Sequence, residues 1–342
     1  MRGAEAPAGP VFDPQRALGW RDVALDGLNC VLRCVEATLA HHGYTPQQIA
    51  RCLAGELDLL GRDMAREFPG CALSWRTADG EGERNWQFVL DSVTAGTPVI
   101  IMPDRYYWPG DEFEGRFHFH DHAVLAYAWC EEEGVLTVLD TDAPPEDGFR
   151  RRLTESAQVR SACTRVAALD LTSPVDQRTG DEFGRAQIVT RTAPLASEAI
   201  ALRHFFGALR ENGLSGELGR GLHVLVLGDL QPLLFLFGEA LTDAQDPQVL
   251  RVRQAALSAA AGAKRLGQAL IAAHSQRDRQ QGYQAALALA DRLLNGVDSL
   301  VAAMRDAGGS VLGGPDPDNV TRALHAKLAA ITETCFGEGA PA

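Results

Sequence analysis

Four short apolar runs in the first half of the chain constrain its fold more than any other feature. They are rich in β-branched residues and bounded by turn residues, as strands are, and they cover residues 97–103, 122–129, 134–140 and 164–171. Together they predict one antiparallel sheet. Beyond about residue 196 the apolar positions instead recur at helical spacing almost to the end. The sequence therefore predicts an α+β domain followed by an all-helical domain.

Helices are also expected before the first of these strands. The stretch DGLNCVLRCVEATLAHHGY reads as a helix that Asp26 or Asn29 can cap and Gly43 can end. A second helix is expected from Pro46, a proline at the first helical position, to about Gly55. The chain is thus predicted to begin with two helices.

Composition and periodicity set the domain boundaries. With 342 residues, 46% of them hydrophobic, the chain is long enough for about two domains. A linker is predicted around the polar, turn-rich stretch SPVDQRTGDEFGR. The expected divisions are a flexible N-terminus over 1–18, an α+β domain over 19–173, a linker over 174–195 and a helical domain over 196–338. The helices of that last domain are expected to start near Ser197, Pro247, Tyr283 and Asp318.

Charge and composition exclude several classes of protein. A net charge of -13 argues against binding to nucleic-acid phosphates. The N-terminus lacks the apolar run of a signal peptide, and the apolar segment 221–238 is broken by His223 and Asp229. That segment suits a buried helix or a homodimer interface better than a membrane span. Seven cysteines without a paired CxxC spacing argue against a disulfide framework and against a four-thiolate zinc site. We expect a cytoplasmic protein with no nucleic-acid or membrane partner.

Three residues in a particular order predict a catalytic site. Cys30 lies in the first turn of its helix, where unpaired backbone N–H groups and the helix dipole favour a thiolate. His122 opens one strand and Asp140 ends the next, and the loop CEEEG between them predicts a hairpin that brings the two together. A cysteine, a histidine and an aspartate are the nucleophile, base and orienting group of a catalytic triad. Each residue by itself would more often be a packing or turn residue.

The same residues resemble a known family. The run NCVLRCVEATLAHHG is similar to the active-site helix of papain-like cysteine peptidase domains that process bacteriocin leaders, with a second cysteine four residues after the first and a glycine at plus thirteen. GTPVIIM, DHAVLAYAW and GVLTVLDT resemble their strand, histidine-strand and aspartate-strand series. The match covers about residues 20–170 and implies a papain-like fold for the α+β domain.

A closer resemblance is to the butirosin biosynthesis protein H family of acyltransferases. The Asp-x-Tyr-Tyr stretch and the histidines ahead of the histidine strand carry it, together with the helical C-terminal half. The resemblance implies transfer of an acyl, aminoacyl or peptidyl group in natural-product (antibiotic) biosynthesis. The donor would be a phosphopantetheine thioester on an acyl or peptidyl carrier protein, and the acceptor an amine-bearing small molecule. Cys30 would be the nucleophile, His122 the base and Asp140 the orienting residue, with no further cofactor and no metal.

The chain departs from the family pattern at the oxyanion hole. Papain-like peptidases usually carry a glutamine several residues before the cysteine, and none lies between Arg16 and Cys30. The Cys30 backbone N–H, with Asn29 or Asp26 nearby, is then the expected source of donors. A peptidase or thioesterase of the same fold is an alternative function, because water could replace the amine as acceptor. A non-catalytic binding protein is a further alternative.

Other residues compete for roles in this site. Cys34 faces the same way as Cys30 but lies one turn deeper, which favours packing, and His120 is the alternative base. His118, His120 and His122 alternate on one face, and HFHDH is close to the HxHxDH string of metallo-β-lactamase-like hydrolases, so a metal-dependent hydrolase is a further alternative. The aromatic stretch before the Pro-Gly turn, with one of these histidines, is expected either to line the substrate site or to pack on the core: Tyr106, Tyr107, Trp108 and His118.

Overall fold

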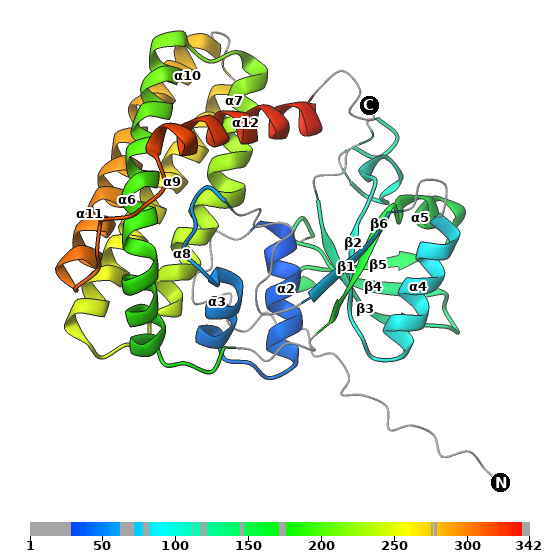
Figure 1. Cartoon of the computed structure of the whole chain (residues 1–342). Coiled ribbons are helices and arrows are strands. Elements are labelled where there is room, and N and C mark those ends of the chain that lie inside the picture. The colour runs from blue at the N-terminus through cyan, green and yellow to red at the C-terminus, as the bar shows by residue number, and fades with distance from the viewer. Residues whose placement is uncertain are drawn as a thin grey trace. The chain divides into compact units, whose positions relative to one another are not determined.

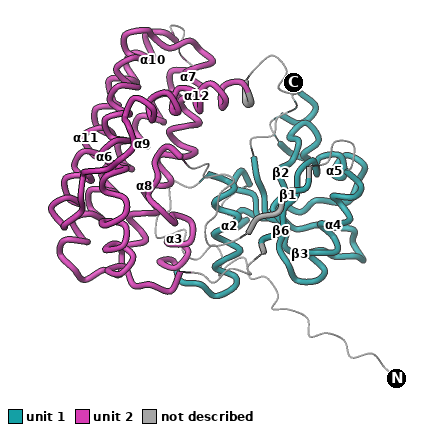
Figure 2. The backbone as a smooth tube through the Cα atoms, in the orientation of Figure 1, with its two compact units in different colours: residues 1–45, 71–174, 341–342 teal, residues 46–70, 175–340 magenta. Residues whose placement is uncertain are grey.

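The computed structural model describes residues 29–61, 72–77, 82–111, 113–116, 118, 122–143, 147–170, 176–274, 276 and 279–336. The chain divides into two compact units, shown in Figure 2. Unit 1 comprises residues 1–45, 71–174 and 341–342, and unit 2 comprises residues 46–70 and 175–340. Unit 1 contains a sheet and helices, whereas the regular structure described in unit 2 is helical, so the predicted α+β class with a helical region is confirmed.

Unit 1 is built on a six-stranded sheet in which every neighbouring pair of strands is antiparallel. The strands lie in the order β1-β6-β2-β3-β4-β5. Their bounds are β1 Ala72–Thr77, β2 Val99–Met102, β3 Val124–Cys130, β4 Val135–Leu139, β5 Arg150–Thr154 and β6 Arg165–Asp170. The four predicted runs are β2, β3, β4 and β6. The sequence reading missed β1 and β5, and β5 (RRRLT) carries three arginines at the sheet edge, where an apolar pattern is not required.

Helices cover both faces of the central strands, as Figure 1 shows for α2 and α4. The helices of unit 1 are α2 Cys30–His41, α4 Gly82–Thr94, α5 Ala157–Ala162 and the 3₁₀ turn η2 Arg105–Tyr107. Val99 and Ile101 on one face join a core cluster with Trp86 of α4, while Ile100 on the other face is equally buried. The helix that begins at Cys30, α2, contacts β2 and also β3, the strand that follows His122.

Unit 2 is a bundle with one helix from the first half of the chain. Its helices are α3 Pro46–Ala54, α6 Gly180–Asn212, α7 Gly216–Val224, the π-helical η4 Leu225–Leu230, α8 Gln231–Ala240, α9 Pro247–His274, α10 Arg279–Ala288, α11 Ala290–Asp306 and α12 Pro317–Phe336. The helices α9 and α11 approach so closely that a Cβ on Gly262 would lie 2.7 Å from the backbone nitrogen of Leu293. A Cβ on Gly296 would lie 2.6 Å from the Cα of Ala259. Glycine is required at this crossing for space.

Two predicted boundaries are wrong. The expected linker over 174–195 is helical from Gly180, since α6 begins there and not near Ser197. A capping box between Thr179 and Glu182 starts the helix, and Gly184 is a packing position, because its Cβ would meet Val249 at 2.6 Å. The predicted helix from Pro46 exists as α3 but belongs to unit 2, not to the expected 19–173 domain. The predicted flexible N-terminus lies outside the described residues.

The apolar segment 221–238 forms most of the continuous stretch α7-η4-α8. Gly216–Ala240 is the one helical stretch among the described residues that passes a test of length and composition for a membrane span. Of its most apolar window, 67% is buried inside the protein. Core helices pass the same test, and the buried side chains of this stretch include Leu225, Val226 and Leu230.

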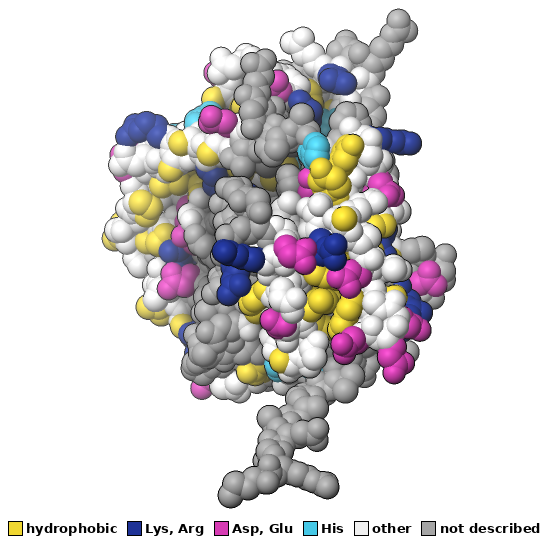
Figure 3. Space-filling model, turned by 90° about the vertical axis from the view of Figure 1, so that its right-hand side faces the viewer, with side chains coloured by type: hydrophobic (Ala, Val, Ile, Leu, Met, Phe, Trp, Pro, Cys, Tyr) yellow, Lys and Arg dark blue, Asp and Glu magenta, His cyan; other side chains and the backbone are white. Residues whose placement is uncertain are grey.

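Charged side chains of both signs are interspersed on the surface. On the face drawn in Figure 3, Asp and Glu side chains lie beside Lys and Arg side chains over the described part of the chain, and the basic ones do not gather there into a single patch.

Candidate active site

Cys30 is the first residue of α2, as predicted. Asn29 is the N-cap: it has an extended backbone conformation, and its side-chain Oδ1 accepts a hydrogen bond of 2.9 Å from the Leu32 N–H. The next residues, Val31 and Leu32, are buried and anchor the turn, whereas Cys30 is partly exposed. Cys34 is buried one turn deeper, among the core residues of unit 1. The helix therefore presents one of its two cysteines at its electropositive end.

The hairpin of β3 and β4 brings His122 and Asp140 together. Leu125 pairs with Leu139, and a bulge between Ala126 and Ala128 shifts the register of the rest of the ladder. Just beyond these paired ends, the His122 Nε2–H donates a hydrogen bond of 2.8 Å to Asp140 Oδ1. Both side chains are buried. The structure thus brings the two residues together, as the predicted hairpin requires.

Cys30 completes the set, because its side chain is within hydrogen-bonding reach of His122. Asp140 occupies Nε2 of the imidazole, so Nδ1 is the ring nitrogen that serves the thiol. A carboxylate on one nitrogen fixes both the tautomer and the plane of the ring. The order is therefore sulfur, Nδ1, Nε2, carboxylate, which is the arrangement of a nucleophile, a base and an orienting group.

The electrostatics of the site favour a charged imidazole. Burial disfavours the imidazolium, but hydrogen bonds to Asp140 and Cys30 and the charges of both outweigh it and raise the pKa of His122 to about 10. Burial also disfavours the carboxylate, yet the hydrogen bond and charge of His122, a backbone N–H and Arg151 lower the pKa of Asp140 to about 2. At neutral pH the pair is thus imidazolium and carboxylate, and an imidazolium stabilises a thiolate beside it.

Three further residues hold Asp140, and the sequence reading missed two of them. The Asp142 backbone N–H donates to Asp140 Oδ1 at 2.9 Å. At the other oxygen, Arg151 Nε forms an ion pair of 2.8 Å and the Trp108 indole N–H donates at 3.4 Å. Trp108 was predicted only as a substrate-lining or packing residue; it is fully buried and supports the carboxylate. Arg151 has no local sequence signal, since the fold alone brings it here, whereas Asp142 follows Asp140 by two residues, the spacing of a local turn in which an aspartate side chain accepts from the backbone.

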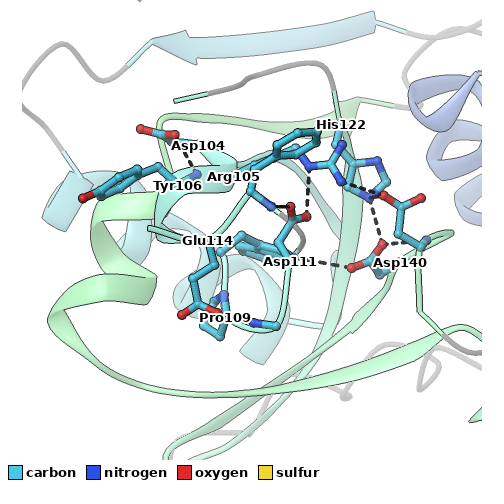
Figure 4. Close-up of polar contacts among 12 residues, drawn as sticks. Asp104, Arg105, Tyr106, Pro109, Asp111, Glu114, His122 and Asp140 are labelled. Carbon is cyan, nitrogen blue, oxygen red and sulfur yellow. Dashed lines mark hydrogen bonds and ion pairs between the residues drawn. The ribbon is translucent and has the colours of Figure 1, made fainter. Parts of the chain in front are cut away.

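A second arginine extends this network, as Figure 4 shows. Arg105 is buried, and its guanidinium pairs with Asp111 at 2.9 Å and with Asp142 at 3.1 Å. The Asp142 carboxylate also lies 3.8 Å from His122 Nε2. The loop that supplies the Asp142 N–H is therefore tied to the η2 turn by charge.

The other predicted site residues lie elsewhere in unit 1. His118 Nδ1 is paired with Asp104 at 2.7 Å, and its ring stacks on Tyr106 with centroids 4.3 Å apart. In Figure 4, Tyr106 and Asp104 lie at the left, away from His122 and Asp140 at the right. Tyr106 and Tyr107 line a separate pocket of about 520 Å³, whose lining does not include the Cys30 set: Tyr106, Tyr107, Glu114, Gly115, Ala157, Gln158 and Ser161. The alternative base His120 and the alternative cap Asp26 lie outside the described residues.

The residues that could hold a metal ion differ from the strand histidines that the sequence suggested. Among the described residues, the set with metal-ligating atoms within 4.8 Å of one another is His122, Asp140 and Asp142, not a pair of strand histidines. Both carboxylates are already paired with guanidinium groups, from Arg151 and Arg105. A cation here would have to displace two ion pairs beside a positively charged imidazole, so the donor set is a poor fit for a metal.

Comparisons with known proteins give no family for this chain. No family model matches it. Zinc finger protein 142 from mouse is 28% identical over 146 residues, a stretch that covers 40% of this chain. The chain spans only 7% of the length of that protein.

Proposed function

We propose that this chain is a cysteine-dependent acyltransferase with a papain-like fold in its sheet-containing unit. Cys30 is the nucleophile, His122 the acid and base, and Asp140 the orienting residue. The observation that supports the proposal best is the hydrogen-bonded series from a helix-start thiol through a buried imidazole to a buried carboxylate. The donor is an acyl or peptidyl thioester on a phosphopantetheine carrier, and the acceptor is a small-molecule amine.

The first half-reaction acylates Cys30. The thiolate attacks the acyl carbonyl carbon, forming a C–S bond and a tetrahedral oxyanion. When the oxyanion collapses, the C–S bond to the donor breaks and His122 gives its Nδ1 proton to the departing thiolate. In the second half-reaction the amine attacks the acyl carbon, His122 takes the amine proton and the Cys30 thiolate leaves. The charged pair is restored for the next cycle.

The helix N-terminus supplies the proposed oxyanion stabilisation. The Cys30 backbone N–H belongs to the first turn of α2, where the helix dipole is positive. The side-chain oxygen of Asn29 is engaged in capping, so the group that Asn29 could offer is its amide nitrogen. A donor from the main chain and one from a side chain can together take the place of the family's glutamine.

Intact-protein mass spectrometry tests the proposal. Wild type, Cys30→Ala and Cys34→Ala are mixed with a panel of short acyl thioesters, and an amine is then added. The second variant is a matched control, because Cys34 lies on the same helix face one turn deeper. We expect an adduct on wild type and Cys34→Ala but not on Cys30→Ala, discharged faster by the amine than by buffer. Equal discharge in buffer would identify a hydrolase, and an adduct on Cys30→Ala would overturn the assignment.

A further inference from the structure

Unit 2 contains a cluster of polar side chains that the proposed reaction does not use. Three helices contribute to it: α7 with Arg220 and His223, α9 with its last residue His274, and α10 with Arg279 and Tyr283. The spacing is three residues on α7 and four on α10, so each pair lies on one helix face. All five groups are donors or become donors when protonated.

The hydrogen bonds inside the cluster leave one nitrogen without a partner. The Tyr283 hydroxyl donates to the Gly216 carbonyl at 3.2 Å and lies 2.5 Å from His274 Nδ1. A phenol has one proton to donate, so His274 Nδ1–H is the donor in the shorter contact. The other ring nitrogen of His274, Nε2, is buried and has no hydrogen-bond partner among the residues that the structure describes. An unsatisfied buried nitrogen is costly and points to an absent ligand.

The second imidazole stands beside the first. The ring centroids of His223 and His274 are 5.7 Å apart. Burial and the neighbouring His274 lower the pKa of His223 to about 4, and burial followed by the charges of Arg220 and Arg279 lowers that of His274. Both rings are therefore neutral at pH 7 when the site holds no counter-charge.

Among the described residues, the charged side chains that act on His274 are both positive. The guanidinium groups of Arg220 and Arg279 both act on His274 and on Tyr283. Within the described part of the chain, no carboxylate acts on His223, His274 or Tyr283. This is unusual in a chain with a net charge of -13. Two imidazoles could share a metal ion, but two guanidinium charges that both act on His274 oppose a cation and favour an anion.

We infer that Arg220, His223, His274 and Arg279, with Tyr283 as support, form a binding site for a phosphate-type oxyanion. The oxyanion pairs with the two guanidinium groups and draws a proton onto His274, whose Nε2–H then donates to it. Arginine pairs with phosphate through charge-assisted hydrogen bonds, and the tyrosine holds the imidazole in the required tautomer. The inference concerns unit 2 only and does not depend on the acyltransferase proposal.

Histidine NMR on the full chain tests the site. The protein is labelled at its histidine side chains, and inorganic phosphate is titrated against chloride at constant ionic strength. His223→Gln and His274→Gln assign the two resonances. We expect a saturable change of the His274 resonance toward the imidazolium form. In Arg220→Gln/Arg279→Gln the affinity should fall by about a hundredfold, since each charge-assisted pair contributes about tenfold or more.

A matched control separates this site from general charge effects. Arg251 is exposed on α9, about 35 Å along the helix from His274, and Arg251→Gln should bind phosphate as wild type does. Cys30→Ala should do so as well, which separates the two proposals. A second titration with phosphopantetheine distinguishes a site for phosphate esters from one for free phosphate. The inference is wrong if the His274 resonance of wild type does not change with phosphate, or if Arg220→Gln/Arg279→Gln binds phosphate as tightly as wild type does. It is also wrong if a parallel titration with zinc changes the His274 resonance and phosphate does not.

Discussion

Asp140→Asn is the substitution that most directly tests the candidate site. It keeps the size of the side chain and removes the charge. In the wild type, His122 and the Asp142 N–H donate to one oxygen of the carboxylate, and the Trp108 indole N–H donates to the other oxygen, which also forms an ion pair with Arg151. An asparagine has one oxygen and one NH₂ group, so it can satisfy only one of these two pairs.

Either orientation of the asparagine disables the site. With its oxygen toward His122, the NH₂ group faces Arg151 and the Trp108 indole, which are themselves donors, and the arginine loses its counter-charge. With its NH₂ group toward His122, the imidazole must accept at Nε2 and carry its proton at Nδ1. That tautomer cannot take a proton from the thiol or the amine. The structure therefore predicts a chemical defect without a large change in shape.

The expected size of the effect follows from the charge that is lost. A hydrogen bond to a charged group is worth about 1.5–3 kcal/mol, and one pKa unit is about 1.4 kcal/mol, so the pKa of His122 should fall from about 10 to roughly 8. In a triad, loss of the orienting carboxylate through the wrong tautomer costs about 10⁴ in turnover. We expect a loss of acylation rate of about that order.

Two assays and one control complete the experiment. Single-turnover acylation by mass spectrometry gives the rate, and NMR titration of the labelled histidines gives the pKa of His122. Asp104→Asn is the matched control, because it removes a buried carboxylate from a contact with another histidine, the partly exposed His118, away from Cys30. The control should acylate within about threefold of wild type, inside the range of ordinary context effects. Wild-type turnover in Asp140→Asn, with His122 still titrating near 10, would refute the reasoning.

Three other expectations follow from the same structure. Arg151→Met should slow acylation by about tenfold, with partial recovery in Arg151→Lys, because only its charge reaches Asp140. Because the pKa of His122 is raised and that of Asp140 is lowered, the pair should stabilise the fold fully between about pH 4 and 6.5. This stabilisation should be lost as the pH rises through about 10 or falls through about 2. Urea unfolding should therefore show a different pH dependence of stability in wild type and His122→Gln, and equal pH profiles would contradict the reasoning. Gly262→Ala should lower the free energy of unfolding by about 1–3 kcal/mol, because the new Cβ would overlap α11. Gly207→Ala, with open space around its Cβ, should raise the free energy of unfolding by up to about 1 kcal/mol. Equal shifts in melting temperature for the two variants would contradict the close crossing of α9 and α11.

Local signals explain why the Cys30 set could be predicted. A cap, an apolar face and a terminal glycine define α2 within fifteen residues, and a four-residue loop over 131–134 defines the hairpin that joins His122 to Asp140. These features depend on neighbours in sequence. Once they form, the start of the first strand must face the end of the second, so the histidine and the aspartate meet.

The residues that support the set depend on distant neighbours and could not be predicted in this way. Arg151 lies at the start of an edge strand whose sequence, RRRLT, has no apolar alternation, and Arg105 lies in a short 3₁₀ turn. The start of α6 was missed for a related reason. Gly180 and Gly184 suggest a turn, but each makes room for a neighbour, Ala244 in one case and Val249 in the other.

Arg151 and Arg105 also explain why Asp140 can act as a charged orienting group at a position where burial alone would favour its neutral form. A buried carboxylate beside an imidazolium could take its proton, which would leave a neutral pair unable to hold a thiolate. Arg151 on one oxygen, and the Asp142 N–H held by Arg105 on the other side, stabilise the charged form of Asp140. The proton then stays on His122. The site is thus arranged so that its positive charge is kept next to Cys30, where the proposed acyl transfer needs it.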